Sequence, residues 1–419
     1  MKKAGKKRSK FHKFLKLLGP GLITGASDDD PSGIATYTQA GAKFGHSLLW
    51  TAILSYPLMV GIQEMCARIG LVTKMGLTGI IKRHYPKALL YMVILISFPS
   101  IILNIGADIA GMGAVANLLV PVIPPWTFSI FFTMLLLYSI IVWSYRKIAT
   151  VLKWLCISLF AYLFIPFITK TDWLGALKSS FIPKFENDID YFLALVGILG
   201  TTISPYLFFW QTSMEVEEIT QKNVVVDKRM ISAMESDVQG GMFLTNIVFY
   251  FIILAAANVL FSAGIYNINS VEEAAMALEP LAGKSAYALF ALGVIGTGLL
   301  AIPVLAGSIS YMISEAFDWE EGLDKKFHEA KGFYGTVTVS LILGLLIQFL
   351  EISPVKALLY TAVLYGMIAP ILIGIILHIC NNKNIMGIYT NSRKANWIGW
   401  ITLIVMAGAS LFLAYQALL

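Results

Sequence analysis

Residues 28–30 are three consecutive aspartates within a run, residues 14–42, that is otherwise apolar and long enough to cross a membrane. Carboxylates are among the most costly side chains to place at the depth of a bilayer. Pro31 has no N–H group and Gly33 is a poor helix former, so the backbone is expected to unwind here. Because an unwound acidic segment must face protein or water, the pattern indicates a cation site at the break of a discontinuous transmembrane helix. The alternative is an external turn that ends a short first helix.

A second interruption lies five predicted spans further along the chain. Residues 197–207 read Gly-Ile-Leu-Gly-Thr-Thr-Ile-Ser-Pro-Tyr-Leu, where Gly200 and Pro205 weaken the helix and Pro205 frees a backbone carbonyl. A lone proline in a transmembrane helix is often only a kink. Breaks at corresponding positions of two five-helix halves, however, are typical of inverted-repeat transporters, which bind their substrate near the midplane of the membrane.

The composition defines a polytopic membrane protein. The chain has 419 residues, of which 57% are hydrophobic and 13% charged, against about 25% charged in soluble domains. The net charge of +6 does not indicate nucleic acid, because the basic residues lie between the spans. No Ser-His-Asp or Cys-His set is readable, so neither an enzyme nor a cofactor is predicted.

Hydropathy predicts eleven spans, all helical. They lie near residues 17–42, 47–70, 88–119, 126–144, 148–169, 191–214, 238–261, 285–312, 333–350, 355–379 and 396–418. Most of the 31 Lys and Arg residues fall in the tail 1–16 and in alternate loops, which predicts a cytoplasmic N-terminus and an external C-terminus. The expected domains are this tail, a transporter core over 17–380 with repeats at 17–169 and 191–380, and a loop with a peripheral helix over 381–419. The second repeat is inverted because each half has an odd number of spans.

Several motifs together resemble those of the NRAMP divalent-metal transporters. They are Gly-Pro-Gly at 19–21, Asp-Pro at 30–31 followed by Gln-Ala-Gly-Ala at 39–42, Gln63, Ala-Arg-Ile-Gly-Leu-Val-Thr at 67–73, Ala-Asp-Ile-Ala at 107–110, and residues 200–206. Each motif alone is weak, but the combination covers the chain to about residue 380. The resemblance implies a LeuT-like fold with 5+5 inverted repeats, discontinuous helices 1 and 6, and alternating access.

The sequence departs from the family pattern in three of its helices. The first break of the family usually reads Asp-Pro-Gly-Asn, but here Gly33 stands in place of the amide while Asp30 is kept. The sixth helix of the family usually offers Met, Pro and His, but here Ser204 and Tyr206 replace Met and His. Gly111 stands where the third helix of the family has an acid. The His of the sixth helix and the acid of the third helix, both linked to proton passage in the family, are therefore absent here.

These departures favour a harder ion. A thioether prefers manganese, iron and cadmium, whereas an all-oxygen environment suits magnesium, calcium and manganese. The sequence thereby resembles the NRAMP-related magnesium transporters, which carry a partly hydrated ion. Consecutive residues of an extended backbone point in different directions, so we expect Asp30 to ligate directly and Asp28 or Asp29 to line the vestibule or bind through water. The candidate metal-site residues are Ser27, Asp28, Asp29, Asp30, Gly33, Thr201, Ser204 and Tyr206.

Two further carboxylates are candidate pathway residues. Asp108 lies in the middle of the third span and is either a carboxylate beside the site or a partner of Arg146, Lys147 or Lys153. Asp237, in the seventh span, either lines a pathway or binds backbone groups.

The resulting prediction is a monomeric secondary transporter that moves Mg²⁺ or Mn²⁺ across the plasma membrane by alternating access. The plasma membrane of a bacterium is favoured. The lipid and the divalent ion are the expected partners. Tyrosine, with an ordinary pKa near 10, does not exchange protons readily at neutral pH as histidine does, so transport is expected to be weakly coupled to protons or uncoupled. The alternatives are a proton-coupled Mn²⁺/Fe²⁺ symporter and a membrane cation sensor that transports nothing.

Overall fold

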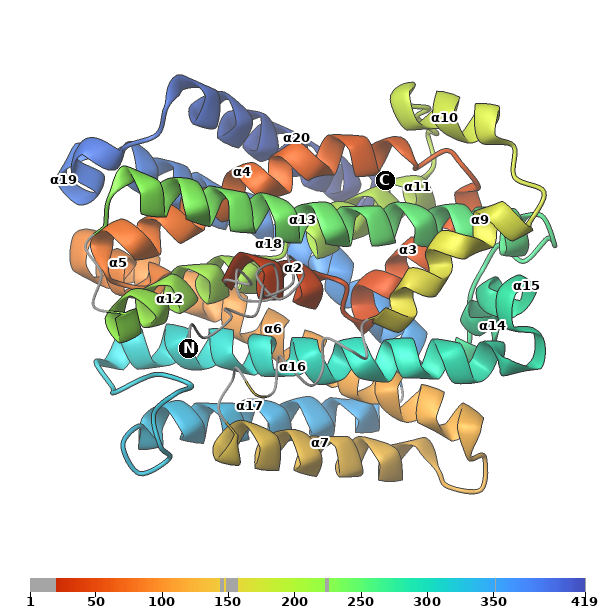
Figure 1. Ribbon diagram of the computed structural model, residues 1–419, viewed down its shortest axis with the longest axis horizontal. Helices are drawn as coiled ribbons and strands as arrows, with labels where there is room; N and C mark the ends of the chain where they lie inside the picture. The colour runs from red at the N-terminus through yellow and green to blue at the C-terminus, as the bar shows by residue number, and fades with distance from the viewer. Residues whose placement is uncertain (1–19, 144–146, 148–156, 223–225, 351, 419) are drawn as a thin grey trace, which may run out of the picture.

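The structure is a computed structural model that describes residues 20–143, 147, 157–222, 226–350 and 352–418. All regular elements in these residues are helices (Figure 1). Eight of the described helices are long and apolar enough to cross a membrane. They are α6 (Lys87–Leu119), α7 (Pro125–Val142), α11 (Ile189–Thr202) continued by α12 (Pro205–Lys222), α13 (Lys228–Ala256) continued by η2 (Ala257–Phe261), α16 (Ala286–Phe317), α17 (Lys331–Ile347) with η5 (Gln348–Leu350), α18 (Pro354–Asn381) and α20 (Arg393–Leu418).

The other three predicted spans take different forms. The first is divided into α2 (Pro20–Asp28) and α3 (Pro31–Phe44), and the second is the single helix α4 (Trp50–Thr73). Of the fifth, residues 148–156 lie outside the described part of the chain, and the remainder forms η1 (Ile157–Phe164) and α9 (Ile165–Ile168). Short helices lie between the spans: α5 (Leu77–His84), α10 (Trp173–Phe181), α14 (Val271–Ala275), η3 (Met276–Leu278), α15 (Glu279–Ala282), η4 (Gly283–Ser285), α19 (Lys383–Met386) and η6 (Gly387–Tyr389).

The first break follows directly from the local sequence. Asp30 has an extended backbone, with φ −68° and ψ 171°, and is the N-cap of α3, while Pro31 occupies the first turn, where its missing N–H is not needed. Asp29 lies between the two helical segments. The break is therefore a helix end followed at once by a well-capped helix start.

The second break has the same origin. Ile203 leaves the helical conformation at the end of α11, and Pro205 begins α12. The Ser204 hydroxyl lies within hydrogen-bond distance of the carbonyls of Thr201 (2.7 Å) and Gly200 (3.1 Å), so its one hydrogen is shared between two acceptors at the end of α11. Both predicted discontinuities, in helices 1 and 6, are confirmed.

Glycines allow the broken helices to pack closely on their neighbours. A Cβ added to Gly25 of α2 would lie 2.4 Å from the carbonyl carbon of Gly241 in α13, and one added to Gly200 of α11 would lie 2.1 Å from the carbonyl oxygen of Ala362 in α18. The long helix α6 packs against α7, α16, α17 and α18, and it also contacts α3 and α12, the helices that begin at the two breaks. The fold therefore surrounds the two breaks with continuous helices.

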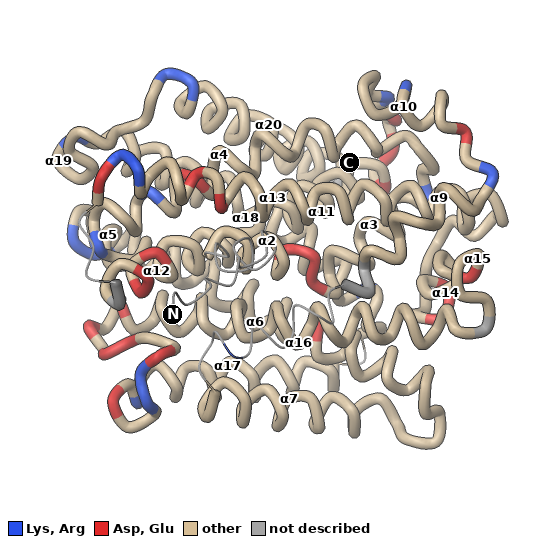
Figure 2. The backbone as a smooth tube through the Cα atoms, in the orientation of Figure 1, with Lys and Arg blue, Asp and Glu red and all other residues tan. Residues whose placement is uncertain are grey.

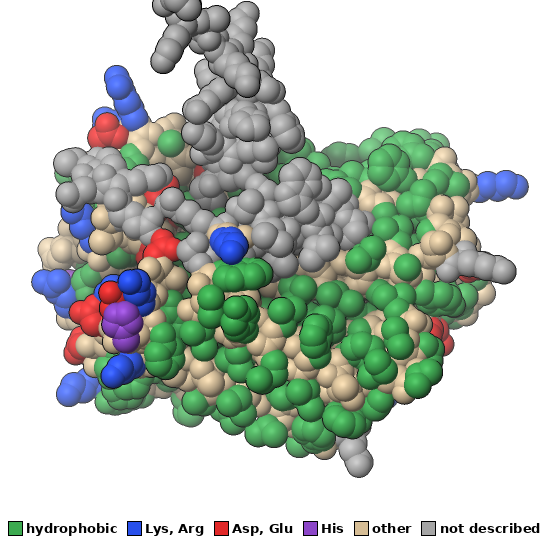
Figure 3. Space-filling model, turned by 60° about the horizontal axis from the view of Figure 1, so that its bottom comes forward, with side chains coloured by type: hydrophobic (Ala, Val, Ile, Leu, Met, Phe, Trp, Pro, Cys, Tyr) green, Lys and Arg blue, Asp and Glu red, His purple; other side chains and the backbone are tan. Residues whose placement is uncertain are grey.

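One broad face of the molecule is covered by hydrophobic side chains (Figure 3). On α7 the large side chains of Phe131 and Met134 are exposed, as expected for a surface in contact with lipid. Lys and Arg gather at the end of the molecule that holds α5 and α19 (Figure 2).

The largest difference at the start of a predicted span concerns the seventh. The seventh span begins at Lys228 instead of 238, because the Asp227 side chain caps the helix by accepting the N–H of Met230 over 2.8 Å. The expected tail, residues 1–16, lies outside the described residues.

Candidate metal site

The two breaks contact each other in the centre of the molecule. The Tyr206 hydroxyl, in the first turn of α12, donates to the Ser27 carbonyl at the end of α2 over 2.9 Å. A Cβ added to Gly33 would lie 3.1 Å from Thr201 Oγ1 of α11 and 3.3 Å from the Asp28 carbonyl oxygen. The candidate residues of the two breaks therefore form one region.

Asp30 is held by hydrogen bonds to both of its carboxylate oxygens. Its Oδ1 accepts the N–H of Gly33 over 2.7 Å, which is the N-cap bond of α3. Its Oδ2 accepts from the side-chain amide of Asn104, on α6, over 2.9 Å. Each oxygen keeps lone-pair capacity for a cation, and the two bonds fix the plane of the carboxylate.

Asp108 lies beside this site. The Asn104 amide nitrogen is also 3.4 Å from Asp108 Oδ2, so one amide connects two carboxylates. Asn104 and Asp108 both have an exposed fraction of 0%. The Lys147 ammonium lies over the Trp143 ring, 4.6 Å from its centroid, and Arg146 and Lys153 lie outside the described residues. Asp108 therefore lies beside the candidate site, and its role there stays a prediction.

Several buried oxygens of the site have no hydrogen-bond partner among the described residues. They are both carboxylate oxygens of Asp28, Oδ1 of Asp29, Oδ1 of Asp108 and the amide oxygen of Asn104. Asp28, Asp29 and Asp30 are exposed by only 1%, 4% and 2%. A buried carboxylate without a partner is costly unless a cation or a proton neutralises it. Carboxylate and amide oxygens are ligands of hard divalent cations, so this set fits such an ion.

The carboxylates do not form a closed cage. Within the described part of the chain, no three His, Cys, Asp or Glu side chains converge closely enough to hold a metal ion. Asp29 instead lies beside Thr245 of α13. The arrangement suits an ion held directly by few protein oxygens and otherwise through water.

The remaining candidate residues make hydrogen bonds within the protein. Their roles in binding or moving an ion stay predictions. Ser204 uses its hydroxyl hydrogen on the carbonyls at the end of α11, and Gly33 contributes its backbone N–H to Asp30. Asp237 Oδ2 accepts the N–H of Gly21, in the first turn of α2, over 2.7 Å. Asp237 thus binds a backbone group, and a role in a pathway stays a prediction.

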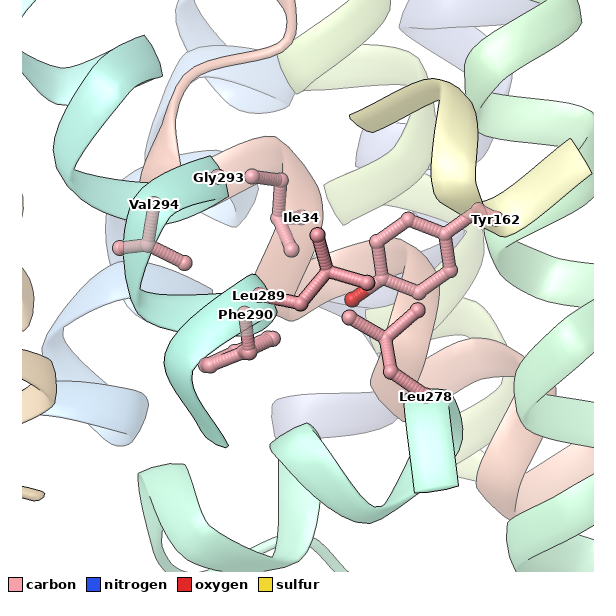
Figure 4. A pocket seen from close by; sticks show the side chains of 7 residues that line it. All are labelled: Ile34, Tyr162, Leu278, Leu289, Phe290, Gly293 and Val294. Atoms are coloured by element: carbon pink, nitrogen blue, oxygen red, sulfur yellow. The ribbon is translucent and has the colours of Figure 1, made fainter. Parts of the chain in front are cut away.

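The site is closed toward the end of the molecule that holds α14 and α15. A cavity next to α3 is lined there by Ile34 and Tyr162 together with residues of η3 and α16 (Figure 4). A neighbouring cavity is lined by Pro31, Gly111 and Leu358 among other residues, all of them apolar. These apolar linings offer little to a hydrated cation.

Toward the opposite end, polar side chains connect the inner halves of the broken helices. The Thr24 hydroxyl of α2 donates to Gln211 Oε1 of α12, and the Gln211 amide donates to Glu215 Oε1 over 2.9 Å. All three side chains are buried. The Thr24–Gln211 bond joins α2 to α12, while the Gln211–Glu215 bond lies within α12.

Sequence reasoning missed Asn104. The available signal was its spacing from Asp108: two polar residues at i and i+4 share one face of a helix that is otherwise apolar around them.

Two broken helices, a buried acidic site between them and a shell of long apolar helices define an integral membrane protein with the LeuT-like fold. The crystal structure of MhsT in complex with L-phenylalanine aligns with a TM-score of 0.64 at 14% identity, covering 96% of this chain and 98% of that one. The chain belongs to the Nramp family, because the family model described as "Natural resistance-associated macrophage protein-like" matches residues 21–416. The family resemblance expected from the motifs is thus confirmed.

Individual relatives agree with this assignment. The chain is 22% identical over 414 residues to the divalent metal cation transporter MntH of Deinococcus radiodurans, covering 97% of this chain and 91% of the relative. The crystal structure of the Eremococcus coleocola manganese transporter, in complex with an aromatic bis-isothiourea compound, aligns with a TM-score of 0.76 at 18% identity. That alignment covers 98% of this chain and 88% of the other. These relatives are transporters, in agreement with the expectation that the chain is not an enzyme.

Proposed function

We propose that the protein is a secondary transporter of divalent metal cations. The observation that carries the proposal is the group of buried carboxylate oxygens that have no hydrogen-bond partner among the described residues, at the junction of two helix breaks. A cation bound at this site is the simplest species that would neutralise these carboxylates. The names of the relatives, a divalent metal cation transporter and a manganese transporter, support the same substrate class.

Within this class, Mg²⁺ is favoured and Mn²⁺ is the next choice. The donors gathered around Asp30 are carboxylate and amide oxygens, and the position that would offer a thioether in the family pattern is Ser204. Mg²⁺ takes oxygen ligands and retains several waters, which agrees with carboxylates that do not converge into a cage. A site made of oxygen donors without sulfur has no preference for the softer transition metals.

Transport proceeds by alternating access and is driven by the gradient of the ion and the membrane potential. Both ends are closed around the site, so each must open in turn: the apolar packing of α3 against α16 at one end, and the bonds between α2 and α12 at the other. The membrane potential contributes about 2.3 kcal/mol per charge per 100 mV, or roughly 4.6 kcal/mol for a divalent ion. We assign the basic end, with α5 and α19, to the cytoplasm (Figure 2).

A proton-coupled Mn²⁺ symporter is the second candidate. It is favoured by one observation: Asp108 is fully buried beside Asp30, and its Oδ1 lacks a partner in the described residues. Such a carboxylate would bind a proton whenever the cation is absent. Against this, Tyr206 uses its hydroxyl on the Ser27 carbonyl, and Gly111 packs against Leu358.

Uptake by proteoliposomes tests the proposal. Saturable flux of Mg²⁺ or Mn²⁺ into vesicles that contain the purified full chain, faster with an interior-negative potential, is the expected result. Vesicles that show no divalent flux above the protein-free background, while the protein still binds the ion, would instead indicate a sensor.

A further inference from the structure

We propose that Asn104 is a specificity-determining residue of the metal site: its amide oxygen accepts a hydrogen bond from a water bound to the ion, and this contact selects ions that keep their hydration shell. The inference rests on the proposed function, since it names how the same site recognises its substrate. No motif in the sequence pointed to this residue.

The orientation of the Asn104 amide is fixed by its neighbours. Its nitrogen faces two carboxylate oxygens, Asp30 Oδ2 at 2.9 Å and Asp108 Oδ2 at 3.4 Å. A flipped amide would direct an oxygen at both carboxylates and lose both bonds, so the hydrogen-bond network determines which end is the nitrogen. The oxygen therefore points away from these two atoms.

That amide oxygen is left without a protein donor. Asn104 is completely buried, and its Oδ1 has no partner within the described chain. Asp108 Oδ1 shares both properties and lies one helical turn away on the same face of α6. Two buried acceptors on one helix face thus lack a donor in the described part of the chain, and a ligand or its water would supply one.

The chemistry of hydrated ions supplies such donors. Waters bound to Mg²⁺ are held tightly and donate hydrogen bonds outward, because this ion dehydrates reluctantly. A neutral amide oxygen adds an acceptor for such a water without adding another charge beside Asp30 and Asp108. An ion that sheds its water and binds the carboxylates directly gains nothing from this acceptor.

The position of Asn104 in the fold suits this role. Asp30 lies at the junction between two helical segments, whereas Asn104 lies within the long helix α6. Since Asn104 also holds Asp30 Oδ2, the residue sets both the direction of the carboxylate and the place of the water.

The test compares Asn104→Leu with Asn258→Leu in the purified full chain. Leucine has nearly the shape of asparagine but neither donor nor acceptor. Asn258 is a matched control, because its amide donates to Thr171 (2.7 Å) and Thr169 (3.3 Å), residues outside the site. The probes are Mg²⁺ alone, Mn²⁺ alone and hexamminecobalt(III), whose ammine ligands do not exchange and donate hydrogen bonds as bound water does.

We expect Asn104→Leu to weaken Mg²⁺ binding roughly 3- to 10-fold, the effect of about one lost hydrogen bond, and Mn²⁺ binding by less. Hexamminecobalt(III) should inhibit Mg²⁺ uptake by the wild type and inhibit the variant more weakly. Asn258→Leu should leave the ratio of the two affinities unchanged. In Asn104→Ser the side chain is too short to reach the water bound to the ion, so this variant should show the same loss of Mg²⁺ preference.

An unchanged ratio of Mg²⁺ to Mn²⁺ affinity in Asn104→Leu, in a protein that still requires Asp30, would overturn the inference while leaving the proposed function intact. Failure of both Asn104 variants to fold, when Asn258→Leu folds, would make Asn104 a packing residue and would also overturn it. A wild type that binds neither ion would refute the proposed function itself.

Discussion

The side-chain amide of Asn104 donates to Asp30 Oδ2 over 2.9 Å and joins two residues that are 74 positions apart in the chain. This bond attaches the break of the first helix to the middle of α6. Asp30 is consequently more than the cap of α3: it is oriented from two sides, by Gly33 and by Asn104. A carboxylate fixed in this way is prepared to bind an ion without reorganisation.

Asp30→Asn should abolish saturable uptake of divalent cations while leaving the fold intact. Asparagine caps helices about as well as aspartate, so the bond to the Gly33 N–H can persist and the melting temperature should change by only a few degrees. What is lost is the charge that binds the ion. Uptake into proteoliposomes and thermal unfolding in detergent measure the two effects.

Asp318→Asn is the matched control for this experiment. Asp318 ends α16 in the left-handed region, with φ 56°, which asparagine also tolerates, and its side chain is largely exposed. Normal uptake by this control and by folded Asp30→Asn alike would exclude Asp30 as a ligand.

Ser204→Met should increase the affinity for Mn²⁺ and Cd²⁺ relative to Mg²⁺, because a thioether favours the softer ions. The change also removes the hydroxyl bonds to the carbonyls of Thr201 and Gly200 and introduces a larger side chain at a buried position, so the protein should lose about 1–3 kcal/mol of stability. Calorimetric titration of both variants with each ion gives the ratio. If the ratio of Cd²⁺ to Mg²⁺ affinity does not change, Ser204 does not face the ion.

Metal-driven flux should leave the pH inside the vesicles unchanged. The Tyr206 hydroxyl donates its hydrogen bond to the Ser27 carbonyl, and Gly111 carries no side chain that could accept a proton. A pH-sensitive dye inside the vesicles, with a proton ionophore as control, reports any co-transport. Acidification that scales with metal uptake would favour the proton-coupled symporter, with Asp108 as the first residue to substitute.

Tyr206→Phe should lower the transport rate more than it lowers ion affinity. The hydroxyl joins the start of α12 to the end of α2, so its loss loosens the two segments that must move together or apart. Loss of one buried hydrogen bond should also cost about 1 kcal/mol of stability. Comparing maximal uptake rate with half-saturating concentration separates the two effects, and an equal loss in both would contradict a role in opening.

Glu321→Gln should make thermal stability less dependent on pH. Glu321 lies in the loop after α16, where burial and the nearby carboxylates of Glu315 and Glu217 raise the pKa of its side chain well above the ordinary value. The folded protein therefore holds a proton that the unfolded chain releases, and stability should fall as the pH rises from the ordinary pKa of glutamate toward the raised one. Glutamine mimics the protonated form.

The measurement is the melting temperature in detergent between pH 5 and pH 9, in steps of about one unit. The matched control is Glu320→Gln in the same loop: Glu320 is fully exposed, and its bond to Lys325 lowers its pKa, so this change should not flatten the profile. Parallel pH profiles of Glu321→Gln and the wild type would show that Glu321 does not hold the proton.

The local sequence determined the class of the protein, the spans and the two breaks. Apolar length fixes which segments can cross a membrane, and the groups that stop a helix, Pro31 and Pro205, act on their own backbone. The position of Asp30 as a cap beside a proline is likewise a property of neighbouring residues. For these features no distant contact had to be known.

The tertiary structure alone decided which oxygens of the site remain free for an ion. Asp108 lies beside Asp30 because α6 passes the break of the first helix, and Asp237 contacts Gly21 because α13 packs on α2. Asn104 belongs to the site for the same reason. Hydrogen bonds between helices depend on how the helices pack, and a pattern along one helix shows a polar face without showing what lies opposite it.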